Sequence, residues 1–363
     1  MIEHLGADFR AVALSARTQT KKLLDQVNRH RPAAVVVAED ADTDCCREIE
    51  RLGAKIYRGS TGISEMVQRD DVDQVLAAIV GAAGLPAVFA AVRAGKCIAL
   101  ANKESLVVAG SLLIPEARKR NVTILPVDSE HSAVFQAMHA GKGQEIAKVI
   151  LTASGGPFRN ATKEQIARAT PQEALAHPTW RMGGKVTIDS ATMFNKGLEL
   201  IEACWLFDLP PEKIEVTIHP ESVIHSMVEF VDGSTLAQLS PPDMRTPIQY
   251  ALTYPDRLPG IGRRMDWTKA VALTFEPPDV EKFPALAIAY DVARRGGTLG
   301  AVMNAANEVA VEAFLGSRIG FGRISDVVSL TIREHQFVAS PAMDDLMEAD
   351  RWARRTASSL LAN

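Results

Sequence analysis

The sequence predicts an α/β protein with three parts: a parallel-sheet domain, an α+β domain and a C-terminal helical bundle. Short apolar runs alternate with amphipathic segments through residues 1–127, which is the pattern of repeated βαβ units in a Rossmann-like domain. Strand-like and helix-like segments then mix without strict alternation over residues 128–253. A proline-, glycine- and arginine-rich linker is predicted at 254–280, and helical periodicity fills 281–363.

The first domain is predicted from its strand candidates, which are FRAVALSA, PAAVVVA, AKIYRG and KCIALA. Helix candidates such as TKKLLDQVNRHR lie between them. The last strand candidate is almost entirely apolar, as expected for a central strand covered on both faces. Ligands bind beyond the carboxyl ends of parallel strands, so Asn102, Lys103 and Glu104 are candidate site residues.

The composition narrows the class of protein. Hydrophobic residues make up 47%, charged residues 23% and the formal net charge is −4, so nothing favours a nucleic-acid partner. No apolar run reaches the roughly 18 residues of a membrane span, and the opening MIEHLGADFR does not resemble a secretory signal. The four cysteines show no CxxC spacing, which favours reduced thiols. We therefore expect a cytoplasmic protein with no membrane partner.

Asp128 and Glu130 form the most distinctive short motif. They follow the strand-like segment NVTILPV and are two residues apart, so both carboxylates can point to one side. Carboxylate oxygens are suitable ligands for a hard divalent cation. The alternative is a solvated acidic loop, which is common for charged residues.

A third carboxylate, Glu199, lies in a predicted helix that begins near IDSATMFNKGLELIEA, with Ser190 or Thr192 as its cap. Asn195, Lys196 and Glu199 follow at helical spacings and can face a ligand together. The alternative is that Lys196 and Glu199 form an ordinary surface ion pair.

Two segments predict an anion site of the kind a phosphate monoester needs. In ASGGPF, Ser154 precedes Gly155 and Gly156, which allow backbone N–H groups to approach an anion. In DSATMFNKG, a helix start offers a dipole together with hydroxyl, amide and ammonium groups. Each segment alone is also compatible with a simple turn or cap.

Residues 173–185, EALAHPTWRMGGK, are predicted to form a lid over the site. They contain His177, Trp180, Met182 and a glycine pair, and a loop of this kind can close over a substrate and exclude water. The alternative is that Trp180 simply anchors a long loop by packing. His219 and His225 lie in a strand-like segment as core or supporting groups, and we favour a structural role for His219.

The order and wording of these segments resemble the 1-deoxy-D-xylulose-5-phosphate reductoisomerase family. The resemblance rests on ANKESLV, PVDSEHSA, ASGGPF, HPTWRMG, IDSATMFNKGLE, HPESVIHSMV, PDMRTPIQYAL and NAANEVAV, which follow one another in the family's order. It runs from about Phe9 into the terminal bundle. It implies a metal-dependent rearrangement and an NADPH reduction that give 2-C-methyl-D-erythritol 4-phosphate, a step of isoprenoid precursor biosynthesis, in a homodimeric enzyme.

The resemblance also implies roles for individual residues. Asp128, Glu130 and Glu199 would be the metal ligands for Mg²⁺, Mn²⁺ or Co²⁺, and Lys103 an active-site lysine near the substrate oxygens. Trp180 and Met182 would belong to the closing loop. The substrate-binding positions would further include Ser129, Ser154, His177, Ser190, Asn195 and Lys196, with Ser154, Ser190, Asn195 and Lys196 at the phosphate.

The family normally begins with a strand and a GxTGxxG turn that receives the dinucleotide pyrophosphate, and this sequence begins after that element. The NADPH-binding Rossmann-like domain is therefore expected to be truncated, either because translation starts upstream or because the chain is a weak or inactive fragment. The positions left to meet NADPH would be Arg17, Thr18, Gly81, Ala82, Asn102, Glu104 and Met244.

Two other functions compete with the reductoisomerase. A truncated, non-catalytic relative would hold metal and sugar phosphate without transferring hydride. Another dehydrogenase with three similar domains would need a different explanation for the paired anion signals and the carboxylates. A purely structural protein gives no reason for either feature.

Overall fold

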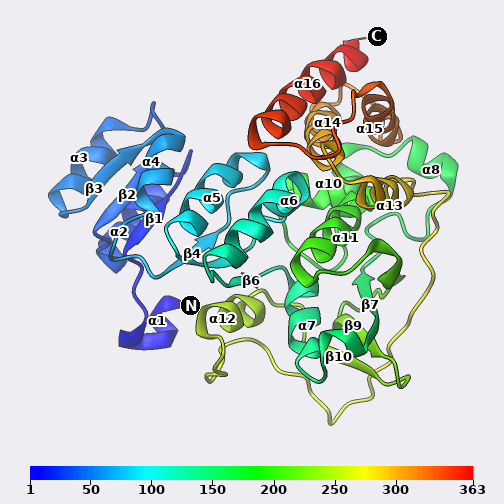
Figure 1. Cartoon of the computed structure of the whole chain (residues 1–363), viewed down its shortest axis with the longest axis horizontal. Helices are drawn as coiled ribbons and strands as arrows, with labels where there is room; N and C mark the ends of the chain where they lie inside the picture. Colours follow the sequence, from blue (N-terminus) through cyan, green and yellow to red (C-terminus); the bar gives the residue numbers. More distant parts are fainter. Residues whose placement is uncertain (363) are drawn as a thin grey trace.

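The computed structural model describes residues 1–362 and begins with two parallel sheets of three strands each (Figure 1). The first has the order β1-β2-β3, with β1 (Ala13–Ser15), β2 (Ala34–Val37) and β3 (Lys55–Arg58). The second has the order β4-β5-β6, with β4 (Gln74–Ala77), β5 (Cys97–Leu100) and β6 (Ile124–Pro126). The prediction of a parallel α/β fold is confirmed.

The parallel strands form two hydrogen-bonded sheets, whereas the sequence pattern suggested one. Within residues 1–362 no strand pairs with the outer edge of β1 or of β4. The burial of the strands agrees with this division. All four residues of β2 are buried, whereas Leu76 of β4 is 45% exposed, as expected for an edge strand.

Helices connect these strands and cover them. They are α1 (Ile2–Leu5), α2 (Thr20–His30), α3 (Thr43–Arg51), α4 (Gly59–Met66), α5 (Leu85–Arg93) and α6 (Glu104–Lys119), with short 3₁₀ turns η1 (Gly6–Asp8) and η2 (Ala82–Gly84). Asp42 caps α3 by accepting the N–H of Cys45 at 2.8 Å. Helix α6 departs from helical geometry at Ala109, next to Gly110, against which the Trp205 ring packs.

The middle of the chain builds a mixed sheet with the order β10-β9-β7-β8. Its strands are β7 (Ile146–Ala153), β8 (Ile214–Ile218), β9 (Ile224–Phe230) and β10 (Thr235–Leu239). Its helices are α7 (Ser129–Met138), α8 (Lys163–Ala167), α9 (Pro171–Leu175), α10 (Gly184–Thr192), α11 (Phe194–Phe207) and α12 (Arg245–Thr253), with 3₁₀ turns η3 (Gly143–Glu145) and η4 (Pro211–Lys213). Helix α12 returns to the first part of the chain, where Ala251 packs on Ala99 and Leu125.

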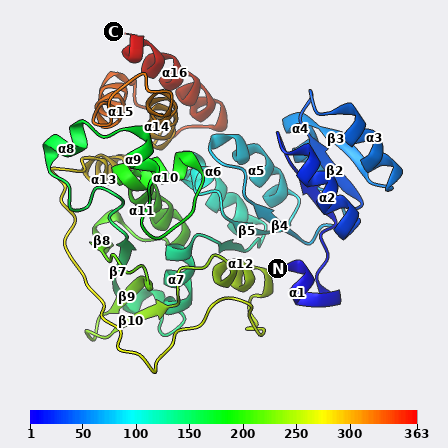
Figure 2. The same cartoon turned by 180° about the vertical axis from the view of Figure 1, so that it is seen from behind.

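Beyond α12, an extended segment runs along the outside of the molecule to the last four helices (Figure 2). These are α13 (Ala285–Arg295), α14 (Leu299–Leu315), α15 (Arg323–Glu334) and α16 (Met343–Ala362). Helix α14 is the most deeply buried of the four and packs between α16, α15 and α6. No helix among residues 1–362 has the length and apolar character needed to cross a bilayer.

The contact between α14 and α6 depends on a missing side chain. A Cβ atom added at Gly300 would lie 2.1 Å from the carbonyl oxygen of Val107. Because backbone cannot yield as a side chain tip can, we expect Gly300→Ala to lower the free energy of unfolding by about 1–3 kcal/mol. Urea titration checks this, with Gly322→Ala as the control, since nothing lies within 4 Å of a Cβ there. Equal stability of the two variants would contradict this packing.

A candidate active site at the ends of three strands

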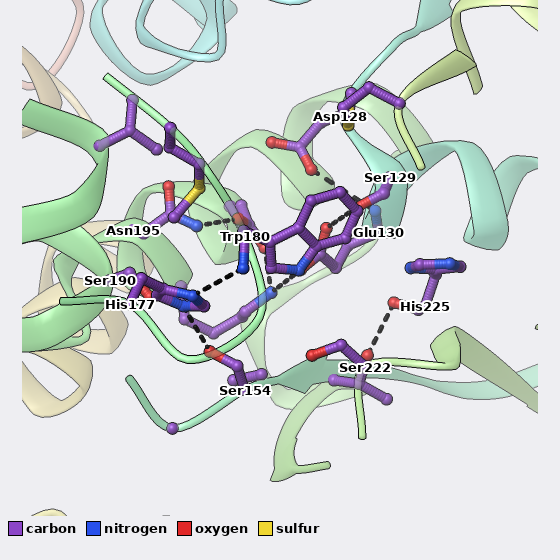
Figure 3. Close-up of a pocket in the computed structure, with 18 of the residues that line it drawn as sticks. Asp128, Ser129, Glu130, Ser154, His177, Trp180, Ser190, Asn195, Ser222 and His225 are labelled. Carbon is purple, nitrogen blue, oxygen red and sulfur yellow. Dashed lines mark hydrogen bonds and ion pairs between the residues drawn. The ribbon is translucent and has the colours of Figure 1, made fainter. Parts of the chain in front are cut away.

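The chain turns at the ends of β5, β6 and β7 to place Lys103, Asp128 and Ser154 around one cavity of about 280 Å³. Helices α10 and α11 and the loop at 177–183 complete its walls. Figure 3 shows the side chains that converge there. Of the predicted site residues, the cavity is lined by Lys103, Asp128, Ser129, Glu130, Ser154, His177, Trp180, Met182, Ser190, Asn195, Lys196, Glu199 and Met244.

Asp128, Glu130 and Glu199 bring one carboxylate oxygen each to within 4.8 Å of one another. Asp128 caps α7 through the N–H of Glu130, which fixes the start of that helix beside α11. Glu199 is only 1% exposed. The alternative of a solvated acidic loop is therefore wrong, because the three side chains converge from two helices.

Two lysines neutralise part of this charge. Lys103 Nζ lies 2.5 Å from Asp128 Oδ2 and 3.0 Å from Glu199 Oε1. Lys196 Nζ lies 2.8 Å from Glu130 Oε1 and also contacts Glu199. Because Lys196 is 3% exposed, the alternative of a surface pair between Lys196 and Glu199 is wrong. Three carboxylates therefore face two ammonium groups, which leaves the cluster with an excess negative charge.

The pKa values follow from burial and from these neighbours. Burial raises the pKa of Glu130, and the nearby Glu199 carboxylate raises it further. Burial alone would raise the pKa of Asp128, but the Lys103 ammonium outweighs it and holds that pKa well below the ordinary value. Burial opposes protonation of Lys103, yet Asp128 and Glu199 raise its pKa well above the usual range. Lys103 therefore stays charged.

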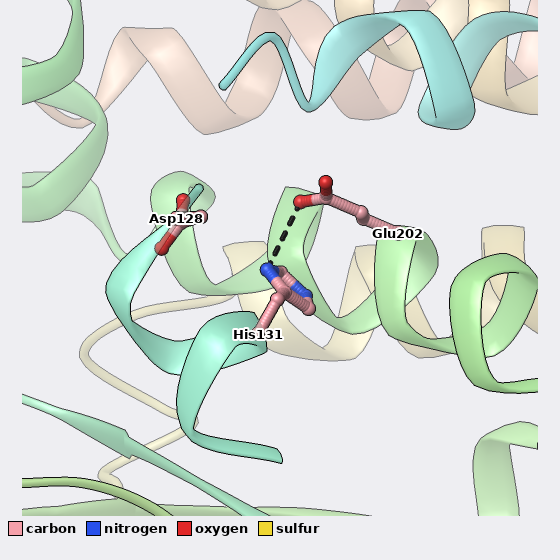
Figure 4. Close-up of side chains that lie close together, drawn as sticks. All are labelled: Asp128, His131 and Glu202. Atoms are coloured by element: carbon pink, nitrogen blue, oxygen red, sulfur yellow. Dashed lines mark ion pairs between the residues drawn. The ribbon is translucent and has the colours of Figure 1, made fainter. Parts of the chain in front are cut away.

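Behind the cluster lies a buried pair that joins the two helices (Figure 4). His131 Nδ1 lies 3.1 Å from Glu202 Oε2, and its Nε2 lies 2.9 Å from the carbonyl oxygen of Glu199. Both side chains are at most 1% exposed. Burial raises the pKa of Glu202 to about 7. Within residues 1–362, His131 Nδ1 and Glu202 Oε2 have no hydrogen-bond partner, so the hydrogen bond that joins α7 to α11 here is the one between His131 Nε2 and the Glu199 carbonyl oxygen.

The opposite side of the cavity is polar and favours an anion. His177 Nδ1 accepts the N–H groups of Thr179 and Trp180 at 3.1 and 2.9 Å, so this nitrogen carries no proton. The neutral ring therefore bears its proton on Nε2, which donates to Ser154 Oγ at 3.0 Å. Burial lowers the pKa of His177, which keeps the ring neutral.

Gly155 and Gly156 bring the end of β7 against α10. Their φ angles are +80° and +66°, a left-handed region that favours glycine. A Cβ at Gly156 would lie 2.9 Å from the carbonyl oxygen of Ser190. The two segments predicted to share one anion are therefore neighbours, as that interpretation required.

The helix start predicted near Ser190 differs from the structure. Ser190 lies in the last turn of α10, and a second helix, α11, begins at Phe194 after Met193 adopts a left-handed φ of 67°. The predicted helix therefore begins a few residues later than its expected cap at Ser190 or Thr192, and the segment before it forms a separate helix that the sequence pattern did not predict. Asn195 and Lys196 thus occupy the first turn of α11, where their side chains contact the carboxylate cluster.

Trp180 and Met182, both in the predicted lid, line the cavity. The ring centroids of Trp180 and His225 are 6.2 Å apart. Sequence reasoning left His225 open, and it did not single out Ser222, Met193 or Ile224, which also line the cavity. Ser222, Ile224 and His225 all lie in HPESVIHSMV, one of the segments on which the family resemblance rests, and that segment could have indicated them. His219 is fully buried and accepts the N–H groups of Val223 and Ile224, which is a structural role.

The predicted cofactor residues fall into three places, and one of these residues, Met244, lines the cavity described above. Gly81, Ala82, Asn102 and Glu104 lie together: Asn102 Nδ2 donates to the carbonyl oxygen of Gly81 at 2.9 Å and lies 3.4 Å from Glu104 Oε2. Arg17 and Thr18 are exposed after β1, in the other parallel sheet. Their role in cofactor binding stays a prediction, as do the individual roles of the other site residues.

The donor set fits a hard divalent cation. Asp128, Glu130 and Glu199 line the cavity, and all three are carboxylates, which suit a hard cation better than zinc. Asp128 also lies close to His131 and Glu202, but these two side chains are buried and do not line the cavity. The excess negative charge and the raised pKa of Glu130 indicate a cluster that a cation would relieve.

The fold and the site define a class, an α/β enzyme that gathers acidic metal-ligand side chains beside an anion-binding surface. Comparison with known sequences identifies the family. Residues 1–110 match the family described as 1-deoxy-D-xylulose 5-phosphate reductoisomerase, and residues 124–207 and 239–356 match two C-terminal domains of the same enzyme. The chain therefore belongs to the 1-deoxy-D-xylulose 5-phosphate reductoisomerase family.

Individual relatives agree with this assignment. The reductoisomerase of Chlorobium limicola is 50% identical over 99% of this chain and 94% of its own length. The reductoisomerase of Heliobacterium modesticaldum is 52% identical over 95% of this chain and 89% of its own length. A crystal structure of DOX-P reductoisomerase with NADPH, fosmidomycin and magnesium superposes with a TM-score of 0.95 at 40% identity, covering 99% of this chain and 94% of that one. The structure of the Zymomonas mobilis enzyme with NADPH superposes with a TM-score of 0.90 at 43% sequence identity. The match covers 98% of this chain and 92% of that one.

Proposed function

We propose that this protein converts 1-deoxy-D-xylulose 5-phosphate into 2-C-methyl-D-erythritol 4-phosphate, with NADPH as the hydride donor and Mg²⁺, Mn²⁺ or Co²⁺ as the metal. The observation that carries the proposal is the meeting of Asp128, Glu130 and Glu199 beside the Ser154 and His177 surface in one cavity. Relatives of about 50% identity with that activity support it. We also propose the three-domain division at residues 127, 253 and 280.

Residues at one end of the cavity are proposed to bind the phosphate, and residues at the other end to stabilise charge at the reacting atoms. The hydroxyls of Ser154 and Ser190, together with Asn195 and Lys196, are proposed to bind the phosphate, far from the reacting carbons. The Nε2–H of His177 orients the Ser154 hydroxyl. Lys103 brings a permanent positive charge to the oxygens next to the metal-ligand carboxylates, where negative charge develops. Trp180 and Met182 close over the substrate and exclude water, which strengthens these interactions.

Two bound groups supply the rest of the chemistry. A divalent ion would be held by Asp128, Glu130 and Glu199 and would supply Lewis acidity beside the substrate. NADPH supplies the hydride, and Gly81, Ala82, Asn102, Glu104 and Met244 are proposed to line its site, with Arg17 and Thr18 at the far end.

The function is tested by following the absorbance of NADPH while 1-deoxy-D-xylulose 5-phosphate and Mg²⁺ are added. We expect oxidation of NADPH that requires both additions. Binding of Mg²⁺ and sugar phosphate without oxidation would instead favour the non-catalytic relative. No binding of either would overturn both functions.

We further propose a homodimer in the cytoplasm. Strand β10 is an edge strand, and the extended segment that passes it exposes apolar side chains, among them Leu258 and Trp267 at 41% and 69%. An apolar surface next to a free strand edge is suited to a second copy of the chain. The four cysteines are free, as expected of a reducing compartment.

The dimer is tested with Trp267→Glu. We expect wild-type protein to sediment as a dimer and the variant to shift toward monomer, because a carboxylate would be buried against apolar surface. Analytical ultracentrifugation at several concentrations measures the shift. A monomeric wild type, or a variant that dimerises equally well, would contradict this surface.

A further inference from the structure

The loop from Ile79 to Gly84 is held from two sides. It follows the carboxyl end of β4, which is where parallel sheets bind ligands. On one side, Asn102 Nδ2 donates to the carbonyl oxygens of Gly81, at 2.9 Å, and of Ile79. On the other side, the N–H of Ala82 donates to Glu308 Oε1 at 3.2 Å. Glu308 belongs to α14 in the C-terminal bundle, 226 residues further along the chain.

Three donors fix the Glu308 carboxylate. Its Oε1 accepts Asn304 Nδ2 at 3.0 Å besides the Ala82 N–H, and its Oε2 accepts Arg354 Nη2 at 2.7 Å. Arg354 also binds both oxygens of Asp350, at 2.7 and 3.0 Å. The guanidinium is thereby held in a defined orientation, and so is the carboxylate it contacts.

The loop has the backbone that this contact needs. Gly81 has a φ of +78°, and a Cβ there would lie 2.6 Å from Glu308 Oε1. Only glycine allows the carboxylate to come this close in this conformation. Ala82 is the first residue of η2, so Glu308 accepts one of the free N–H groups at the start of a helical segment.

The same helix also reaches the end of the lid. Asn307 Nδ2 donates to Asp189 Oδ1 at 2.8 Å, and Asp189 pairs with Lys185 at 2.6 Å. Lys185 in turn pairs with Glu104 at 3.3 Å, next to Lys103. Helix α14 therefore contacts the loop at Gly81 and also α10, which follows the lid.

We propose that Glu308 is a positioning residue for NADPH binding, acting through the backbone of Gly81 and Ala82. The inference rests on the proposed function and adds to it a residue from the helical bundle. Glu308 holds the loop at the carboxyl end of β4 in the conformation that receives the dinucleotide, and Asn102 holds it from the opposite side. The bundle thereby acts on cofactor affinity without contacting the sugar phosphate.

The test compares Glu308→Ala with Glu312→Ala, an exposed carboxylate one turn further along α14. Isothermal titration calorimetry of the full chain measures the affinity for NADPH. We expect Glu308→Ala to bind NADPH about tenfold more weakly, since a hydrogen bond to a charged group contributes about that factor, and Glu312→Ala to match wild type. Mg²⁺ affinity and the KM for 1-deoxy-D-xylulose 5-phosphate stay unchanged. Hydrogen exchange at the Ala82 amide becomes faster.

A second variant covers the case in which Glu308→Ala does not fold. Arg354→Ala keeps the Ala82 contact but frees the carboxylate, so a smaller loss of NADPH affinity in the same direction supports the inference. Unchanged NADPH affinity in both variants of an active wild type overturns the inference alone. A parallel loss of NADPH, Mg²⁺ and substrate affinity overturns it as well, because it indicates a general structural role. A wild type that binds no NADPH overturns the proposed function and this inference together.

Discussion

Replacing Glu199 with glutamine is expected to lower kcat/KM for 1-deoxy-D-xylulose 5-phosphate by about 10²–10³-fold, the size seen when one group that stabilises developing charge is removed. Glutamine keeps the shape of the side chain but removes its charge. Glu199 is contacted by Lys103, Lys196 and Asn195 Nδ2, all of them donors. An amide nitrogen among these donors would repel them, and two carboxylates facing two ammonium groups would attract a cation weakly.

The loss should appear in metal binding as well as in turnover. Calorimetry with Mg²⁺ is expected to give a much weaker affinity for Glu199→Gln, while NADPH affinity stays at the wild-type value. Glu212→Gln is the control, because Glu212 is 61% exposed and pairs with Arg294 at the surface. Wild-type turnover and Mg²⁺ affinity in Glu199→Gln would show that these three carboxylates do not form the metal centre.

The sequence predicted the position of the site better than its internal contacts. Strand ends are visible as apolar runs that stop, so Lys103 and Asp128 were correctly expected where β5 and β6 end. Ser154 was predicted instead from the glycine pair that follows it. Glu199 was placed with them by helical spacing and by the family resemblance. The partnership of Lys196 with Glu130 joins residues 66 positions apart, and no local pattern encodes such a contact.

Three features of the fold were not predicted from the sequence, for physical reasons. The break between α10 and α11 depends on one left-handed residue, Met193, and methionine has no preference for that conformation. The contact of Glu308 with Ala82 depends on how the bundle packs against α6, which is settled by tertiary packing at Gly300. The division of the parallel strands into two sheets is likewise a matter of pairing, which the apolar pattern of a strand does not specify.

Replacing Lys103 with methionine is expected to lower the free energy of unfolding by about 3–5 kcal/mol in buffer without divalent cations, because it leaves buried carboxylates without their partner. Methionine keeps the unbranched apolar stem of the side chain and removes the ammonium group, with its charge and its hydrogen-bond donors. Lys103 is 8% exposed, and its ammonium contacts Asp128, Glu199 and Asn195. Lys148→Met is the control, since Lys148 pairs with Glu215 at the surface, where such pairs contribute about 0–1 kcal/mol.

Mg²⁺ distinguishes a metal centre from an ordinary buried ion cluster. A cation bound by Asp128, Glu130 and Glu199 would replace the lost positive charge, so the midpoint of urea unfolding should rise more with Mg²⁺ in Lys103→Met than in wild type. Turnover should not recover with it, because the metal does not replace the ammonium at the substrate oxygens. If Mg²⁺ leaves the variant as unstable as before, the carboxylates are stabilised by lysine alone and the metal binds elsewhere.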